Sequence, residues 1–239
     1  MSKSISKNQS ISKKASDEPT SNEVAELQKA FDRKVKAGVK HLRKNSLALD
    51  SWIAESGPCG LQIEWERELF EAIVRAIAHQ QLHGRAAETI LGRLCAGFKC
   101  DGFPTARQLR GAPLEKLRGM GFSNAKGIAI QGIAAAAAAG EIPNRALAAT
   151  MTDEELIERL LPLRGVGRWT VEMLLIFTLG RLDVMPVDDF GVKSGLQQLF
   201  GLAAMPKKAE FAELTEAWGP YRSLGAWYLW RKADAGKVK

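Results

Sequence analysis

The sequence has little cysteine and no long apolar run. Its three cysteines, Cys59, Cys95 and Cys100, are odd in number and form no Cys-x-x-Cys pair. This argues against a disulfide framework and against a zinc site, so no metal is expected to be required. No run of about 18 apolar residues is present, which predicts no transmembrane helix and no membrane partner. The N-terminus also lacks the apolar core of a secretory signal, which predicts a cytoplasmic, nucleoid-associated protein.

The alternation of apolar and polar residues that marks an exposed β-strand is also missing. Apolar residues instead recur at three- and four-residue spacing, and capping residues, glycines and prolines separate the segments. The pattern predicts an all-α protein with about ten helices. The expected helices cover residues 22–39, 48–54, 65–77, 86–98, 106–109, 114–118, 124–139, 153–160, 168–179, 190–200, 207–217 and 221–233.

The charge balance is basic, with 34 lysines and arginines against 27 acidic residues and a net charge of +7. This favours a polyanionic partner but points only weakly to nucleic acid. Residues 1–20 are rich in serine and lysine and nearly free of large apolar groups, so we predict a disordered basic tail there. The tail could add non-specific DNA affinity or serve only as a solubilising extension. Residues 21–239 are long enough for one folded domain with a real core.

Two glycines, Gly165 and Gly167, mark a tight hairpin between helices at residues 160–170. Glycine lets the backbone turn without Cβ clashes, and the turn would aim backbone N–H groups outward at the start of the next helix. Such groups form an anion site that can hold a nucleic-acid backbone without reading its sequence. An ordinary hairpin turn that binds nothing is the alternative, and the basic flanks and downstream acids argue against it. The residues predicted to bind DNA here are Arg164, Gly165, Val166, Gly167, Arg168 and Thr170.

Two adjacent acids, Asp188 and Asp189, precede the expected helix at residues 190–200. An N-cap role explains one of them, but not both, because neighbouring carboxylates repel each other. A carboxylate at a helix N-terminus is favoured by the helix dipole, and it is suited to stabilising a developing positive charge such as a sugar oxocarbenium ion. One well-placed group of this kind contributes about 3–4 kcal/mol in a transition state. The same acid could orient an attacking water.

These residues resemble a known family. The segments LRGVGRWTVEM at 163–173 and DVMPVDDF at 183–190 are similar to the signature of the helix-hairpin-helix DNA glycosylases, in particular the DNA-3-methyladenine glycosylase II branch. Shorter similarities at 76–82, 103–105, 117–126 and 222–230 extend the resemblance over about residues 60–232. The resemblance implies two interlocked helical lobes over residues 21–239, with the active site in the cleft between them. It also implies the compact form without an N-terminal β lobe.

The resemblance assigns roles by position. The catalytic acid falls on Asp189, with Asp188 as its capping neighbour or as the reserve acid. Trp169 stands where lyase-competent members carry a nucleophilic lysine, which implies a monofunctional enzyme that uses water. The implied base pocket comprises Trp169, Trp230 and Met173, where Met173 replaces a tyrosine of some members. The residues implied to enter the gap left by a flipped base are Gln80, Gln81 and Leu82.

The implied activity is base excision repair: hydrolysis of the N-glycosidic bond of 3-methyladenine and 7-methylguanine in double-stranded DNA after base flipping. No cysteine follows Cys100, so the four-cysteine iron–sulfur loop of some relatives is absent. The family implies no cofactor beyond a monovalent cation at the hairpin carbonyls, and it suggests a monomer. Two alternatives stay open: the same scaffold acting on uracil, hypoxanthine or mismatched bases, and a non-catalytic helix-hairpin-helix DNA-binding module.

Overall fold

The computed structural model describes residues 20–82, 84–99 and 102–236. The predicted tail therefore lies, apart from Thr20, outside the described residues. Every element in the described ranges is helical and no strand occurs among them, which confirms the all-α class. No helix in these ranges is long and apolar enough to cross a membrane.

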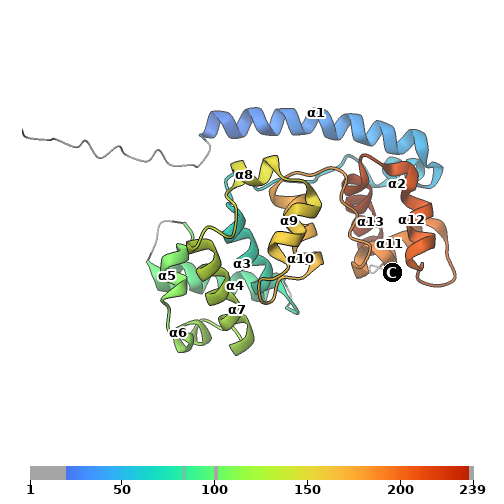
Figure 1. Ribbon diagram of the computed structural model, residues 1–239. Helices are drawn as coiled ribbons and strands as arrows, with labels where there is room; N and C mark the ends of the chain where they lie inside the picture. The colour runs from blue at the N-terminus through green and yellow to red at the C-terminus, as the bar shows by residue number, and fades with distance from the viewer. Residues whose placement is uncertain (1–19, 83, 100–101, 237–239) are drawn as a thin grey trace, which may run out of the picture.

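The helices form two groups, spanned by a long N-terminal helix (Figure 1). One group contains α3 to α10, and the other contains α2 and α11 to α13, with α1 running above both. This arrangement confirms the predicted two-lobed organisation. The elements are α1 (Ser21–Asn45), α2 (Leu47–Ser56), α3 (Leu69–His79), α4 (Gly84–Phe98), α5 (Ala106–Arg110), α6 (Leu114–Gly119), α7 (Asn124–Ala138), α8 (Arg145–Thr150), α9 (Asp153–Leu160), α10 (Arg168–Met173), the π-helix η1 (Leu174–Thr178), α11 (Phe190–Phe200), α12 (Lys208–Thr215), the 3₁₀-helix η2 (Glu216–Trp218) and α13 (Arg222–Gly236).

Several expected helix boundaries agree with local capping. The Thr105 and Thr152 side chains each accept an N–H bond three residues on and complete a capping box with Gln108 and Glu155. The Ser123 side chain caps α7 in the same way. These contacts follow from neighbours in the chain, which is why the sequence predicts them well.

Three expectations on the helices were wrong. The described residues contain thirteen α-helices rather than about ten; the twelve expected ranges lack only α8, whose six residues carry too little periodicity to be recognised. The segment expected as a helix from residue 65 begins only at Leu69, since Trp65 lies in a turn and its indole donates to Gln28 Oε1 at 2.8 Å. The helix expected over 168–179 changes to a π-helix after Met173.

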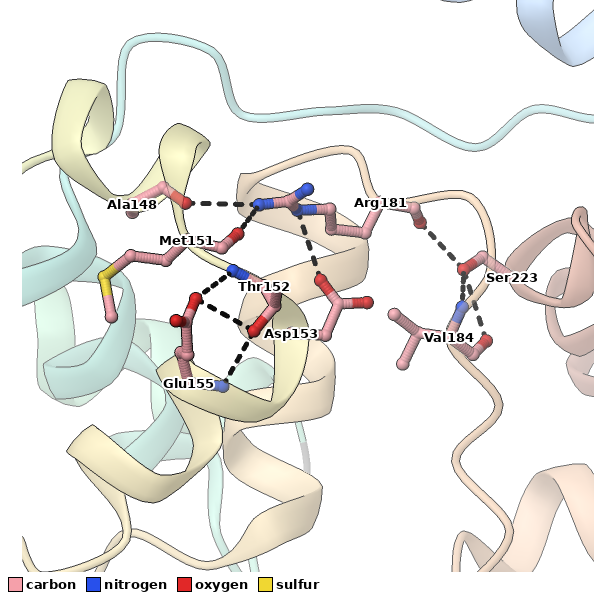
Figure 2. A network of polar contacts seen from close by, with 8 residues as sticks. All are labelled: Ala148, Met151, Thr152, Asp153, Glu155, Arg181, Val184 and Ser223. Atoms are coloured by element: carbon pink, nitrogen blue, oxygen red, sulfur yellow. Dashed lines mark hydrogen bonds and ion pairs between the residues drawn. The ribbon is translucent and has the colours of Figure 1, made fainter.

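A polar network ties the two groups of helices together (Figure 2). The Arg181 guanidinium donates to the carbonyls of Ala148 (3.2 Å) and Met151 (2.6 Å) and pairs with Asp153 at 3.3 Å. The hydroxyl of Ser223, which is fully buried on α13, donates to the Arg181 carbonyl at 2.8 Å and accepts from the Val184 amide at 2.9 Å. The network thus holds residues 181–184 in place, and from there the chain continues to residues 188 and 189.

Candidate active site

The carboxylate of Asp189 accepts three hydrogen bonds at the start of α11. Oδ1 accepts from the Val192 amide and from Trp230 Nε1, both at 2.8 Å, and Oδ2 accepts from Trp169 Nε1 at 2.8 Å. Charge-assisted bonds of this kind hold a carboxylate firmly. Each carboxylate oxygen has two lone pairs, so Oδ2 can still accept from, or face, a further group. The side chain is half-buried and therefore accessible to a substrate.

The two indoles that hold Asp189 come from different lobes. Trp169 lies on α10 and is 40% exposed, whereas Trp230 lies on α13 and is half-buried. The Trp230 ring also packs on Phe177, with ring centroids 5.6 Å apart. The acid is therefore clamped at the boundary between the two helical groups, where the family resemblance expects the active site.

A cavity of about 470 Å³ lies beside Trp169. Trp169, Met173 and Phe177 form its apolar side, and its other residues come mainly from α3, α4 and the segment before α3. The volume falls within the range of small-molecule pockets. The predicted pocket residues Trp169 and Met173 thus line the same cavity. Trp230 does not line it but packs against Phe177, which does.

The capping role expected for Asp188 was wrong. Asp189 itself caps α11, because its Oδ1 binds the Val192 amide. Asp188 is exposed, with Oδ1 3.3 Å from Lys193 Nζ and Oδ2 3.0 Å from Lys208 Nζ. Hydrogen bonds from Lys208 and Lys193 hold the pKa of Asp188 below its usual value. The geometry therefore favours Asp189 over Asp188 as the acid that faces a substrate.

Gly191 is a positioning residue that sequence reasoning missed. A Cβ at this position would lie 2.9 Å from Trp230 Cδ1 and 3.2 Å from Asp189 Oδ1. The space for the Trp230–Asp189 bond thus exists only because residue 191 has no side chain. A glycine in the first turn of an expected helix is the only signal in the sequence, and it does not reveal the distant tryptophan.

In Gly191→Ala, the base release that the family resemblance implies is expected to slow by about 10–100-fold, because the new methyl group displaces the indole and shifts the carboxylate. Single-turnover kinetics at saturating enzyme would measure this. Gly132→Ala is the matched control, since a Cβ on this helical glycine meets no atom within 4 Å. An unchanged rate in Gly191→Ala would show that the clamp on Asp189 does not matter for chemistry.

The glycine hairpin has the backbone expected for a phosphate site. Gly165 has a φ of +85°, and Gly167 precedes α10 in an extended conformation. Within the described part of the chain, the amides of both glycines donate to no protein acceptor. The Arg164 side chain is exposed and forms no ion pair there. These groups can therefore serve an anion.

Three residues predicted to bind DNA at the hairpin are engaged within the protein, and their DNA contacts stay predictions. Val166 is 7% exposed and its amide closes the turn on the Leu163 carbonyl at 3.0 Å, so it contributes packing. Thr170 is 3% exposed and lines the cavity instead of reaching outward. The guanidinium of Arg168 is taken up by Glu154, at 3.0 Å, and by Glu172, at 3.3 Å.

The acid Glu172 lies almost fully buried one turn after Arg168. Burial raises the pKa of Glu172, and the neighbouring Arg168 opposes that shift. The i, i+4 spacing of Arg168 and Glu172 was a visible signal of this pair. The exposed cation of Arg168 is therefore paired with two carboxylates at the hairpin.

The turn after α3 also differs from expectation in one residue. Gln81 (φ +55°) and Leu82 (41% exposed) project outward. Gln80, in contrast, donates from Nε2 to the Gly165 carbonyl at 3.0 Å and so joins this turn to the hairpin. We call residues 80–82 the wedge turn. Its outward-facing residues are Gln81 and Leu82, whereas the Gln80 side chain bonds within the protein.

Lys126 supports the wedge turn and was not predicted. Its ammonium donates to the carbonyls of Ala78 at 2.8 Å and Gln80 at 2.6 Å. Desolvation lowers the pKa of Lys126. Because the side chain lies on α7, far from residues 78 and 80 in sequence, only the packing of α7 on α3 brings them together.

In Lys126→Met, the base excision that the family resemblance implies is expected to fall by about tenfold on fully paired DNA, because two charge-assisted bonds that hold the wedge turn are lost. Excision of the same lesion from single-stranded DNA, where no base must be flipped from a duplex, should change little. Lys126→Arg, which keeps N–H donors, is the matched control. An equal loss on both substrates would contradict a role in holding the wedge turn.

A family model decides the classification: that of the HhH-GPD superfamily of base excision DNA repair proteins matches residues 74–220. The chain belongs to this superfamily. The match includes the wedge turn, the hairpin and Asp189, but neither α1 nor Trp230. The predicted helix-hairpin-helix DNA glycosylase family is thereby confirmed.

Among relatives of this HhH-GPD protein, the alkylbase DNA glycosidase-like protein mag2 of Schizosaccharomyces pombe is 39% identical over 203 residues, which cover 84% of this chain and 94% of mag2. DNA-3-methyladenine glycosylase 1 of the same yeast is 42% identical over 166 residues, covering 70% and 73%. The solved structure of S. pombe 3-methyladenine DNA glycosylase (Mag1) with abasic DNA superposes with a TM-score of 0.75 at 37% identity, covering 82% of this chain and 95% of Mag1.

Proposed function

We propose that this protein is a monofunctional DNA glycosylase that hydrolyses the N-glycosidic bond of alkylated purines, 3-methyladenine and 7-methylguanine, in double-stranded DNA. The observation that carries the proposal is the Asp189 carboxylate, held by a helix amide and two indoles, of which Trp169 also borders the cavity. The printed names of the most similar relatives, which are alkylbase and 3-methyladenine glycosylases, support the same substrate class.

DNA binding is assigned to two neighbouring elements. The free amides of Gly165 and Gly167, with the exposed Arg164, hold a backbone phosphate. Gln81 and Leu82 of the wedge turn enter the space left when a nucleotide leaves the helix, at a cost of a few kcal/mol for unstacking. Because Gln80 joins the wedge turn to the hairpin, both elements meet the duplex as one unit. A monovalent cation at the hairpin carbonyls stays a proposal.

The base is bound in the cavity by Trp169, Met173 and Phe177. A 3- or 7-alkylated purine carries positive charge, so aromatic faces attract it through stacking and cation–π contact. The thioether of Met173 adds a polarisable surface that adapts to the shape of the base. Trp230 supports this wall through its contact with Phe177.

The reaction needs one acid and one water. The glycosidic bond breaks, its electron pair neutralises the cationic base, and the positive charge passes to the sugar. The negative charge of Asp189 stabilises that sugar cation. Water then adds at the anomeric carbon and loses its proton to Asp189 and from there to solvent. Trp169 offers no amine that could attack the sugar, so the products are the free base and an intact abasic strand.

The test is the release of 3-methyladenine and 7-methylguanine from methylated duplex DNA, measured by chromatography of the free bases. Strand cleavage is followed in parallel with and without alkali. We expect base release, and cleavage only after alkali treatment. Failure to release either base would contradict the substrate assignment, and cleavage without alkali would contradict the monofunctional assignment.

A further inference from the structure

The positive charge of the chain is concentrated outside the part that carries the active site. Helix α1 contains seven lysines and arginines against three acids, so it holds +4 of the net charge of +7. Residues 46–239, which contain the hairpin, the cavity and Asp189, hold 23 basic and 22 acidic residues. Most of the excess charge therefore lies on α1, and residues 46–239 are nearly neutral.

The charge of α1 is organised along one face. Four residues recur at spacings of three, four and four, which places them in one row on a helix. All four are exposed, and none of them forms an ion pair within the described ranges. We call this row the basic face of α1; its residues are Arg33, Lys36, Lys40 and Lys44.

The opposite side of α1 is committed to packing. Phe31, Gly38 and Leu42 are buried, and a Cβ on Gly38 would lie 2.5 Å from both Tyr221 and Leu224. This close packing fixes the rotation of the helix, so the basic face is held toward solvent. A helix that binds membranes needs exposed apolar residues beside its basic ones. The apolar side of α1 instead packs against the rest of the protein, which argues against a membrane surface as the partner.

The basic face is also remote from the hairpin. Figure 1 shows α1 along one side of the molecule, while the loop that joins α9 to α10 lies at the other. The basic face and the hairpin are thus placed to contact different segments of a partner. We therefore expect α1 to bind either a different partner or a second segment of DNA.

We infer that the basic face of α1 binds the phosphate backbone of a second DNA duplex while the active site holds the first. Four cations in a row of about 16 Å match the regular negative charge of a duplex. The contact carries no base-reading group, so it is independent of sequence. An enzyme with this second contact bridges two DNA segments and transfers between them without first dissociating into solution.

A bridging assay tests this. A duplex with an abasic-site analogue is immobilised and loaded with enzyme, and a fluorescent lesion-free duplex is then added. Wild type should capture the second duplex, with a log–log salt slope of about 3–4 for four phosphate contacts. The variant R33Q/K36Q/K40Q/K44Q should capture at least about tenfold less, since each lost contact removes favourable counterion release. Its single-turnover base release should equal that of wild type, which separates this inference from the proposed function.

The matched control removes four exposed cations elsewhere on the described surface, and it should retain capture. Failure of wild type to capture the second duplex, or an equal loss in the control, would overturn the inference. Capture of immobilised polyglutamate by wild type, without capture of the duplex, would overturn it in favour of an acidic protein partner. The control variant is R107Q/R110Q/K207Q/R231Q.

Discussion

Asp189→Asn is expected to lower the single-turnover rate of 3-methyladenine release by about 10²–10³-fold, the effect of removing one preorganised electrostatic group. The amide has nearly the same shape but no charge to stabilise the sugar cation. It also presents an N–H₂ group to a site that supplies three N–H donors, from Val192, Trp169 and Trp230, so at least one bond must be lost. Binding to abasic-site DNA, measured by fluorescence anisotropy, should be retained.

Asp188→Asn is the matched control for this prediction. It removes only exposed ion pairs to Lys193 and Lys208, which solvent screens, so the rate should change little. The two neighbouring acids therefore give opposite expected outcomes. A large loss in Asp188→Asn with full activity in Asp189→Asn would reverse the assignment made from the geometry.

Gly165→Ala is expected to weaken DNA binding by about 10–100-fold, which corresponds to the 1–3 kcal/mol cost of a strained backbone. Its φ of +85° disfavours any other residue, and the new Cβ would lie 3.2 Å from Ala129 Cβ and Ile77 Cδ1. The hairpin must shift, and the amides that face the phosphate shift with it. The salt dependence of binding should fall at the same time, because a phosphate contact is lost.

Substitutions at two further glycines distinguish the effect of backbone strain from the loss of a phosphate contact. A Cβ on Gly167 meets no atom within 4 Å, so Gly167→Ala should keep the melting temperature but weaken DNA binding by filling the space that a phosphate approaches. Gly140→Ala strains another positive-φ glycine (+79°) at the end of α7 and should lower stability without changing DNA affinity. Unchanged DNA affinity in both Gly165→Ala and Gly167→Ala would contradict the phosphate site.

The sequence was informative wherever one stretch of chain contains all the interacting groups. The capping boxes at Thr105 and Thr152 and the turn at Gly165 depend on neighbours within a few residues. The resemblance of residues 163–173 and 183–190 likewise placed Trp169 and Asp189 on one short segment. Local patterns therefore sufficed for the helical class, the hairpin and the family, and the choice of Asp189 as the catalytic acid stays a prediction.

Contacts between distant segments were decided by the tertiary structure alone. Arg164 and Arg168 look alike in sequence, yet only Arg168 meets Glu154 across the hairpin. Gln80 turns inward because the Gly165 carbonyl lies beside it, and Lys126 reaches the same turn from α7. The clamp on Asp189 joins α10, α11 and α13, and it closes only because Gly191 leaves room for Trp230. A hydrogen bond depends on distance in space, and for these pairs that distance is set by how the helices pack.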